Sequence, residues 1–126
     1  MNSIAFDEDV MGRLRARHPR YHETAYLFVL SALHHVLSGL EEPRHITGRE
    51  LVEGARDLAL ERFGPMARTV LEYWGVRTTS DLGELVFALV DCGILIKQEG
   101  DVPEEFEDVF DFEEVFERNY PWGSSV

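Results

Sequence analysis

The chain of 126 residues contains a single cysteine, Cys92, so it cannot form a disulfide within itself. It also lacks an apolar run long enough to cross a bilayer, which takes about 20 residues. Its longest run, over residues 25–33, is interrupted by Ser31. Acidic residues at 7–9 stand where a secretory signal would need an apolar segment. We therefore expect a protein of the reducing cytoplasm with no membrane segment.

Basic charge is scarce, with 12 Lys and Arg residues against 24 Asp and Glu residues and a net charge of −12. Nine acidic residues and one basic residue fall within 101–126, which therefore carries −8 of this total. No Lys or Arg lies between Thr78 and Ile96. Because nucleic-acid binding needs cations against phosphates, we expect no nucleic-acid partner. The charge favours a basic partner or serves solubility.

The five histidines do not form a metal-binding pattern. His18 and His22 are four residues apart, but Pro19 between them argues against a continuous helical face. His34 and His35 are adjacent on a predicted helix and point about 100° apart, so they cannot both bind one ion. We therefore expect no metal site.

Signatures of catalysis are missing as well. Cys92 falls at the end of a predicted helix beside Asp91, where the helix dipole and the carboxylate both disfavour a thiolate. The chain has no HExxH motif, no paired cysteines and no glycine-rich phosphate loop. We expect no catalytic residue and no cofactor.

The sequence does contain a series of helix start and stop signals. Apolar residues at helical spacing predict helices over 7–17, 20–38 and 48–63, and two more from Pro65 to Gly75 and from about 79 to Gly93. Thr47 and Glu50 form a capping box, which should contribute about 1 kcal/mol. The fifth helix is apolar nearly all round, which predicts burial on most sides.

Residues 94–98 are typical of a short strand, and residues 106–110 could supply its returning partner. Three short helices followed by a hairpin is the element order of a winged helix. Asp111 and Glu114 form a second capping box ahead of a helix over 112–119. We predict a mainly α single domain over 1–120, winged-helix-like in its second half, with a small antiparallel β-hairpin, a short C-terminal helix and a loose tail at 121–126.

Four segments together carry a resemblance: RYHETAYLFV at 20–29, HITGREL at 45–51, FGPMA at 63–67 and DLGELVF at 81–87. They resemble a conserved hypothetical family of small bacterial proteins from the Verrucomicrobia and Planctomycetes. The resemblance spans about residues 5–118. It implies kinship and transfers no catalytic residue.

Arg20, Tyr21 and His22, with three arginines between 13 and 17 just before them, form the main basic concentration. They are a candidate site for an anion or another small ligand. The alternative, which we favour, is that the arginines solvate the first helix and pair with the acidic C-terminal segment of the same chain.

The C-terminal segment interleaves six aromatic residues with nine acids, more aromatic surface than a disordered tail keeps in water without cost. Either it straps over the helices, which we favour, or it docks on another subunit or partner. Its candidate partner-binding residues are Phe106, Phe110, Phe112, Phe116 and Trp122.

These patterns favour a non-enzymatic, cytoplasmic protein-interaction or accessory module that binds an unknown protein or a second copy of itself. The main alternative is a small-molecule-binding or enzymatic domain that uses Arg20, Tyr21 and His22. A winged-helix transcriptional regulator is a third class, and the acidic charge disfavours it.

Overall fold

The computed structural model describes residues 8–95 and 103–118, and it is mainly helical, as predicted. The five α-helices are α1 (Glu8–Arg17), α2 (Glu23–Ser38), α3 (Gly48–Phe63), α4 (Ala67–Tyr73) and α5 (Thr79–Asp91). Three shorter elements accompany them: the 3₁₀ turns η1 (Gly64–Met66) and η2 (Pro103–Phe106), and the π-helical turn η3 (Glu114–Arg118).

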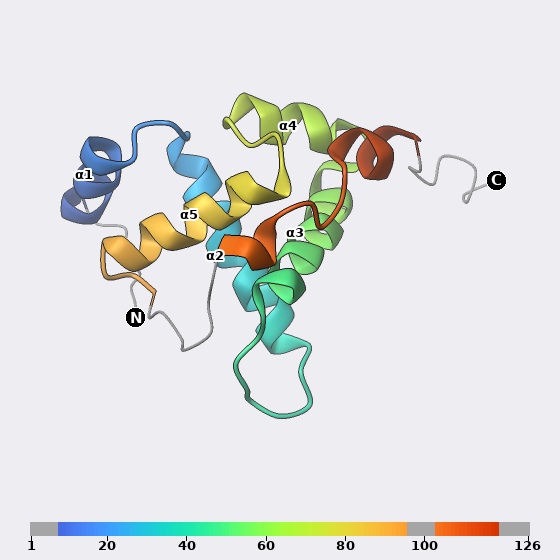
Figure 1. The fold of residues 1–126 in the computed structure, drawn as a ribbon, viewed down its shortest axis with the longest axis horizontal. Helices are drawn as coiled ribbons and strands as arrows, with labels where there is room; N and C mark the ends of the chain where they lie inside the picture. The colour runs from blue at the N-terminus through green and yellow to red at the C-terminus, as the bar shows by residue number, and fades with distance from the viewer. Residues whose placement is uncertain (1–7, 96–102, 119–126) are drawn as a thin grey trace.

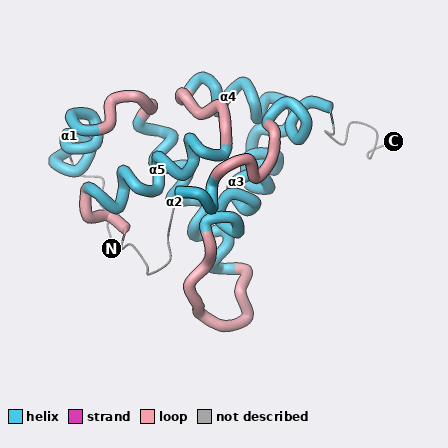
Figure 2. The backbone as a smooth tube through the Cα atoms, viewed as in Figure 1, coloured by secondary structure: helices cyan, strands magenta, loops and turns pink. Residues whose placement is uncertain are grey.

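The centre of the molecule is the helix pair α2 and α3, which the loop over 39–47 joins at one end (Figures 1 and 2). Helix α5 packs on both, and α4 covers the far end of α3 together with η3. Helices α2, α3 and α5 contribute to one hydrophobic core, and their largest fully buried apolar side chains are Tyr26, Val29, Val52, Leu85 and Leu89. Within the described residues, no helix is both long and apolar enough to cross a membrane.

Helix α3 begins and ends where the sequence predicts. The Thr47 hydroxyl accepts a hydrogen bond from the Glu50 N–H at 3.1 Å, and Glu50 Oε1 accepts the Thr47 N–H at 2.9 Å. The predicted capping box is therefore confirmed. Thr78 and Asp81 form another capping box at the start of α5, which begins at Thr79.

The predicted strand at 94–98 is wrong in its described part, because Ile94 and Leu95 complete the end of α5 instead. Gly93 has φ +79°, and the N–H groups of Ile94 and Leu95 both donate to the Leu89 carbonyl, at 2.9 and 3.3 Å. This is a Schellman-type helix end, which uses the donors that a strand would present to its neighbour. Residues 96–98 lie outside the described residues.

The returning strand predicted at 106–110 is also wrong, so the β-hairpin has no support in the described residues. Pro103, which lacks an N–H, opens the 3₁₀ turn η2, and Asp108 adopts φ +48°. The Phe106 carbonyl and the Val109 N–H both bond to the Thr79 hydroxyl, at 2.6 and 3.2 Å. Backbone groups that a hairpin would pair with a second strand are therefore bonded to a side chain of α5.

The starts of two other helices differ from prediction by a few residues, whereas the start of the C-terminal helix agrees with it. Helix α2 begins at Glu23 rather than at residue 20, because His22 caps it by accepting the Thr24 N–H at Nδ1. Pro65 lies in the 3₁₀ turn η1 that leads into α4. The C-terminal helix starts at Phe112, with Asp111 accepting the Glu114 N–H at 3.0 Å, and its described part continues as the π-helical turn η3.

Replacing Thr47 with Ala should lower the free energy of unfolding by about 1 kcal/mol, because the Glu50 N–H loses its acceptor. Thr69→Ala is a matched control on the exposed side of α4, where the same change slightly favours the helix. Chemical denaturation measures both values. Equal stability of Thr47→Ala and the wild type, with unchanged denaturant dependence, would contradict the role of this cap.

Candidate functional site

Phe106 anchors the C-terminal segment to the helices and is 4% exposed. A Cβ at Gly83 would lie 2.6 Å from the Phe106 ring, and one at Gly48 would lie 2.8 Å from it. The ring therefore lies against the backbone at the start of α3 and in the second turn of α5, where only glycine leaves room. Glu105 Oε1 also accepts the Gly48 N–H at 3.2 Å.

The aromatic residues after Phe106 pack on one another. Phe112 and Phe116 are buried, and their ring centroids lie 5.1 Å apart in an edge-to-face arrangement. Phe110 is half-buried and stacks on Phe112 at 5.6 Å. Of the five candidate partner-binding residues, three are therefore buried inside the chain, one is half-buried, and Trp122 lies outside the described residues.

Arg20 and Tyr21 converge on two acidic residues of α5 rather than on a cavity. The Tyr21 hydroxyl donates to Asp81 Oδ1 at 2.9 Å and to Glu84 Oε1 at 2.8 Å. The Arg20 guanidinium pairs with the same carboxylates at 3.1 and 3.0 Å and lies 5.2 Å from the centre of the Tyr21 ring. Burial, followed by the hydrogen bonds to both carboxylates, raises the pKa of Tyr21 well above its usual value, so the hydroxyl stays a proton donor.

Other basic residues near this cluster also have acidic partners, although not the predicted ones. Arg15 pairs with Glu23 of α2, and Arg17 pairs with Asp91 at the end of α5. The described C-terminal segment instead pairs with α4, through Arg68 and Glu117 at 2.5 Å. The charges of the basic cluster are thus largely balanced within the chain, and His22 serves as a helix cap.

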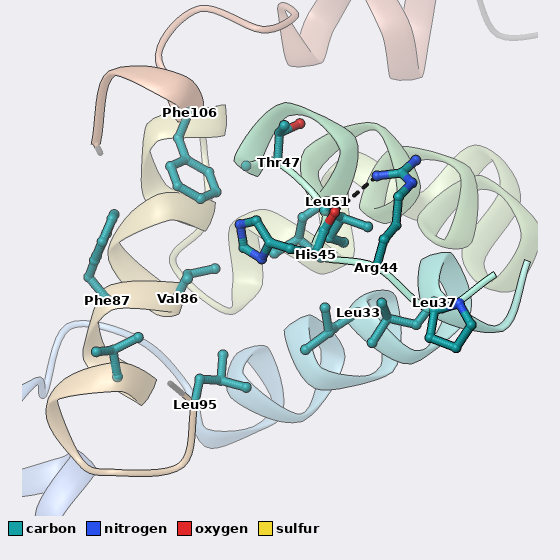
Figure 3. Close-up of a pocket in the computed structure, with 14 residues that line it drawn as sticks. Leu33, Leu37, Arg44, His45, Thr47, Leu51, Val86, Phe87, Leu95 and Phe106 are labelled. Carbon is teal, nitrogen blue, oxygen red and sulfur yellow. Dashed lines mark hydrogen bonds between the residues drawn. The ribbon is translucent and has the colours of Figure 1, made fainter. Parts of the chain in front are cut away.

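A pocket of about 560 Å³ lies between α2, α5, η2 and the start of α3 (Figure 3). Its walls are mostly apolar, and the side chains from α2 and α5 face each other across it. The described residues that line it are Leu33, Leu37, Pro43, Arg44, His45, Ile46, Thr47, Gly48, Leu51, Val86, Phe87, Val90, Leu95 and Phe106.

The polar lining residues bond within the chain. Arg44 forms a two-pronged pair with the Glu50 carboxylate at 2.7 and 3.1 Å and donates to the His45 carbonyl at 3.0 Å. Thr47 is committed to the α3 cap. The hydrogen bond from Arg44, followed by that from the Thr47 N–H, lowers the pKa of Glu50 to about 2. These groups therefore stiffen the rim of the pocket.

Sequence reasoning missed this pocket because it treated the fifth helix as buried on most sides. Leu82, Leu85 and Leu89 are indeed buried in the core. The neighbouring side chains Val86 and Val90 are half-buried and open into the pocket. An apolar position against a cavity has the same sequence pattern as one against packed side chains.

One group of possible metal ligands occurs among the described residues: His18, Asp91 and Cys92. His18 comes after α1, whereas the other two lie at the end of α5. Sequence spacing paired His18 only with His22, because a contact across 73 residues leaves no local pattern.

A scan against protein-family models, a search of curated proteins and a search of solved structures each found no match to this chain. The resemblance of the four segments to a bacterial family therefore stays a prediction.

Gly83→Ala should destabilise the protein by about 1–3 kcal/mol, because the added methyl group overlaps the Phe106 ring in a packed core. Gly12→Ala in α1 is the control, since a Cβ there meets nothing within 4 Å and alanine favours a helix. Chemical denaturation compares the two variants. If Gly83→Ala lowers the free energy of unfolding as much in a Phe106→Ala background as in the wild type, overlap with the Phe106 ring is not the cause of the loss.

Arg44→Gln should raise the pKa of Glu50 from about 2 towards its usual 4.5, because the carboxylate loses its main hydrogen-bond donor. In the wild type, stability contributed by ionised Glu50 is present above its unfolded-state pKa and is lost as pH falls towards 2. The side-chain carboxyl carbon shift, followed by NMR against pH, measures the pKa. Arg49→Gln, which removes the adjacent pair with Glu53, should leave Glu50 unchanged.

Proposed function

We propose that this protein is a non-enzymatic binding module that holds an apolar segment of a protein partner in the pocket between α2 and α5. The observation that carries the proposal is the pocket itself, which is about 560 Å³ in volume and mostly apolar along two helices. Pockets that hold a helix in a groove have this character, since apolar side chains at helical spacing supply most of the affinity.

The polar groups of the pocket favour a protein segment over a small polar ligand. Sites for small molecules usually add a few polar groups aimed at the ligand. Here Arg44 bonds to Glu50, and Thr47 bonds to the backbone of α3. These groups are already satisfied and would gain little from a polar ligand.

The charge of the chain indicates the chemistry of the partner. The net charge of −12 attracts a basic protein over the Debye length and raises its rate of association. We therefore expect the bound segment to be an amphipathic helix with an apolar face and basic flanks. Weakening of the complex by added salt would follow from this charge.

The alternative in which Arg20, Tyr21 and His22 bind a ligand has less support. Arg20 and Tyr21 bond to Asp81 and Glu84, so an incoming anion would have to displace two carboxylates. Native mass spectrometry of the purified protein tests for a retained small ligand. A stoichiometric bound mass would move the weight of evidence to a small-molecule function.

Leu37→Asp should abolish recovery of the partner when the tagged protein is purified from its native host. Leu37 lines the pocket and is 42% exposed, so a carboxylate there meets the apolar face of the bound segment without disturbing the core. Leu27→Asp is a matched control, because Leu27 is on the same helix, is 45% exposed and is absent from the lining. Quantitative mass spectrometry compares the proteins recovered with each variant.

A partner recovered with the wild type and Leu27→Asp, and lost with Leu37→Asp, is the expected result. Binding of a synthetic Leu/Lys helix of about four turns, followed by NMR shifts, then shows where on the surface such a segment binds. Equal recovery of every co-purified protein with both variants would refute the pocket as the binding site.

A further inference from the structure

Three side chains with metal-binding atoms meet where the end of α1 reaches the end of α5. His18 Nε2 lies 3.0 Å from Asp91 Oδ2. A ring nitrogen of His18, a carboxylate oxygen of Asp91 and the Cys92 Sγ all lie within 4.8 Å of one another. The sulfur is buried, with Cys92 3% exposed, whereas the His18 and Asp91 side chains are 33% and 48% exposed. The group therefore has a dry inner side and an outer side open to solvent.

An imidazole, a carboxylate and a thiolate are three of the ligands that Zn²⁺ takes in proteins. With bonds of about 2.0–2.3 Å, the ligand atoms of a tetrahedral zinc centre lie about 3.3–3.8 Å apart. The observed separations differ from these values by at most about 1.5 Å. A rotation of the cysteine side chain can close this difference. Three protein ligands leave the fourth position on the exposed side for water.

The electrostatics at this point favour a cation. Cys92 caps the C-terminal end of α5, where the helix dipole is negative, and the last turn of α5 contains no basic residue. The features that disfavour a free thiolate at Cys92 therefore attract a metal ion, and metal coordination itself removes the thiol proton. Arg17 is the competing cation, 3.3 Å from Asp91 Oδ2 on an exposed side chain that is free to swing away.

The neighbouring hydroxyl does not compete for the metal. Tyr26 donates to the His18 carbonyl at 3.0 Å, which fixes the backbone that carries the imidazole. The phenol thus acts as a support for His18 rather than as a ligand.

We propose that His18, Asp91 and Cys92 form a Zn²⁺ site that fastens α1 to the end of α5. The described contacts of α1 fit such a role. Over residues 12–17, where the side chains are described, Leu14 is buried and Arg15 and Arg17 form exposed ion pairs. Exposed pairs of this kind contribute little stability. The proposal is independent of the pocket between α2 and α5.

Titration of the reduced, metal-free full chain with Co²⁺ tests the site, since cobalt replaces zinc and reports its ligands by absorption. One equivalent should produce a near-ultraviolet thiolate-to-cobalt charge-transfer band, and Zn²⁺ should displace it. Cys92→Ser should remove the band. His18→Ala should weaken binding by at least about tenfold, and its partial exposure keeps this variant folded. His34 is an exposed histidine on α2, away from the proposed site, so His34→Ala should bind cobalt as the wild type does.

Zn²⁺ should also raise the melting temperature of the wild type and of His34→Ala, and it should not raise that of His18→Ala. Absence of a charge-transfer band at stoichiometric cobalt would overturn the proposal. Cobalt bound without that band, or bound equally by His18→Ala, would assign the metal to surface carboxylates and would overturn it as well.

Discussion

The constraint on which much of this fold depends is the close fit of one ring, that of Phe106, against the backbone of two helices. Gly48 and Gly83 leave the space for it, and the buried Thr79 hydroxyl bonds to the Phe106 carbonyl beside the ring. This contact anchors the strongly acidic C-terminal segment to the core through a buried aromatic side chain. Because Phe106 also forms one wall of the pocket, the same contact that holds the C-terminal segment in place shapes the proposed binding site.

A second constraint is the buried carboxylate of Asp81, which is 4% exposed and yet fully bonded. Its Oδ2 accepts the N–H groups of Arg77 and Thr78, and its Oδ1 accepts the Tyr21 hydroxyl and pairs with Arg20. One residue therefore caps α5 and ties it to the segment that joins α1 to α2. A buried charge is tolerated only with partners of this kind, which explains why Arg20 and Tyr21 bond to α5 rather than to a ligand.

Prediction from the sequence was accurate where the deciding interactions are local. Helix α3 was predicted to the residue, because Thr47 and Glu50 lie three positions apart and Phe63 precedes a Gly-Pro pair. It failed after α5, where the Thr79 hydroxyl, about 30 residues away in sequence, binds the backbone that a hairpin would have used. The pocket and the His18–Asp91–Cys92 group were not predicted for the same reason, since each is formed by residues from distant parts of the chain. Burial of Phe112 and Phe116 agrees with the favoured strap.

Helix α5 connects these features, because successive residues on it face different surroundings. Leu85 and Leu89 pack in the core, Val86 and Val90 line the pocket, and the following turn presents Asp91 and Cys92 to His18. A cation that fastens α1 to the end of α5 would therefore also fix one wall of the pocket. Linkage requires that any effect of the metal on partner affinity equals the effect of the partner on metal affinity. Substitutions at Leu37 and His18 separate the two sites, since neither residue contributes to both.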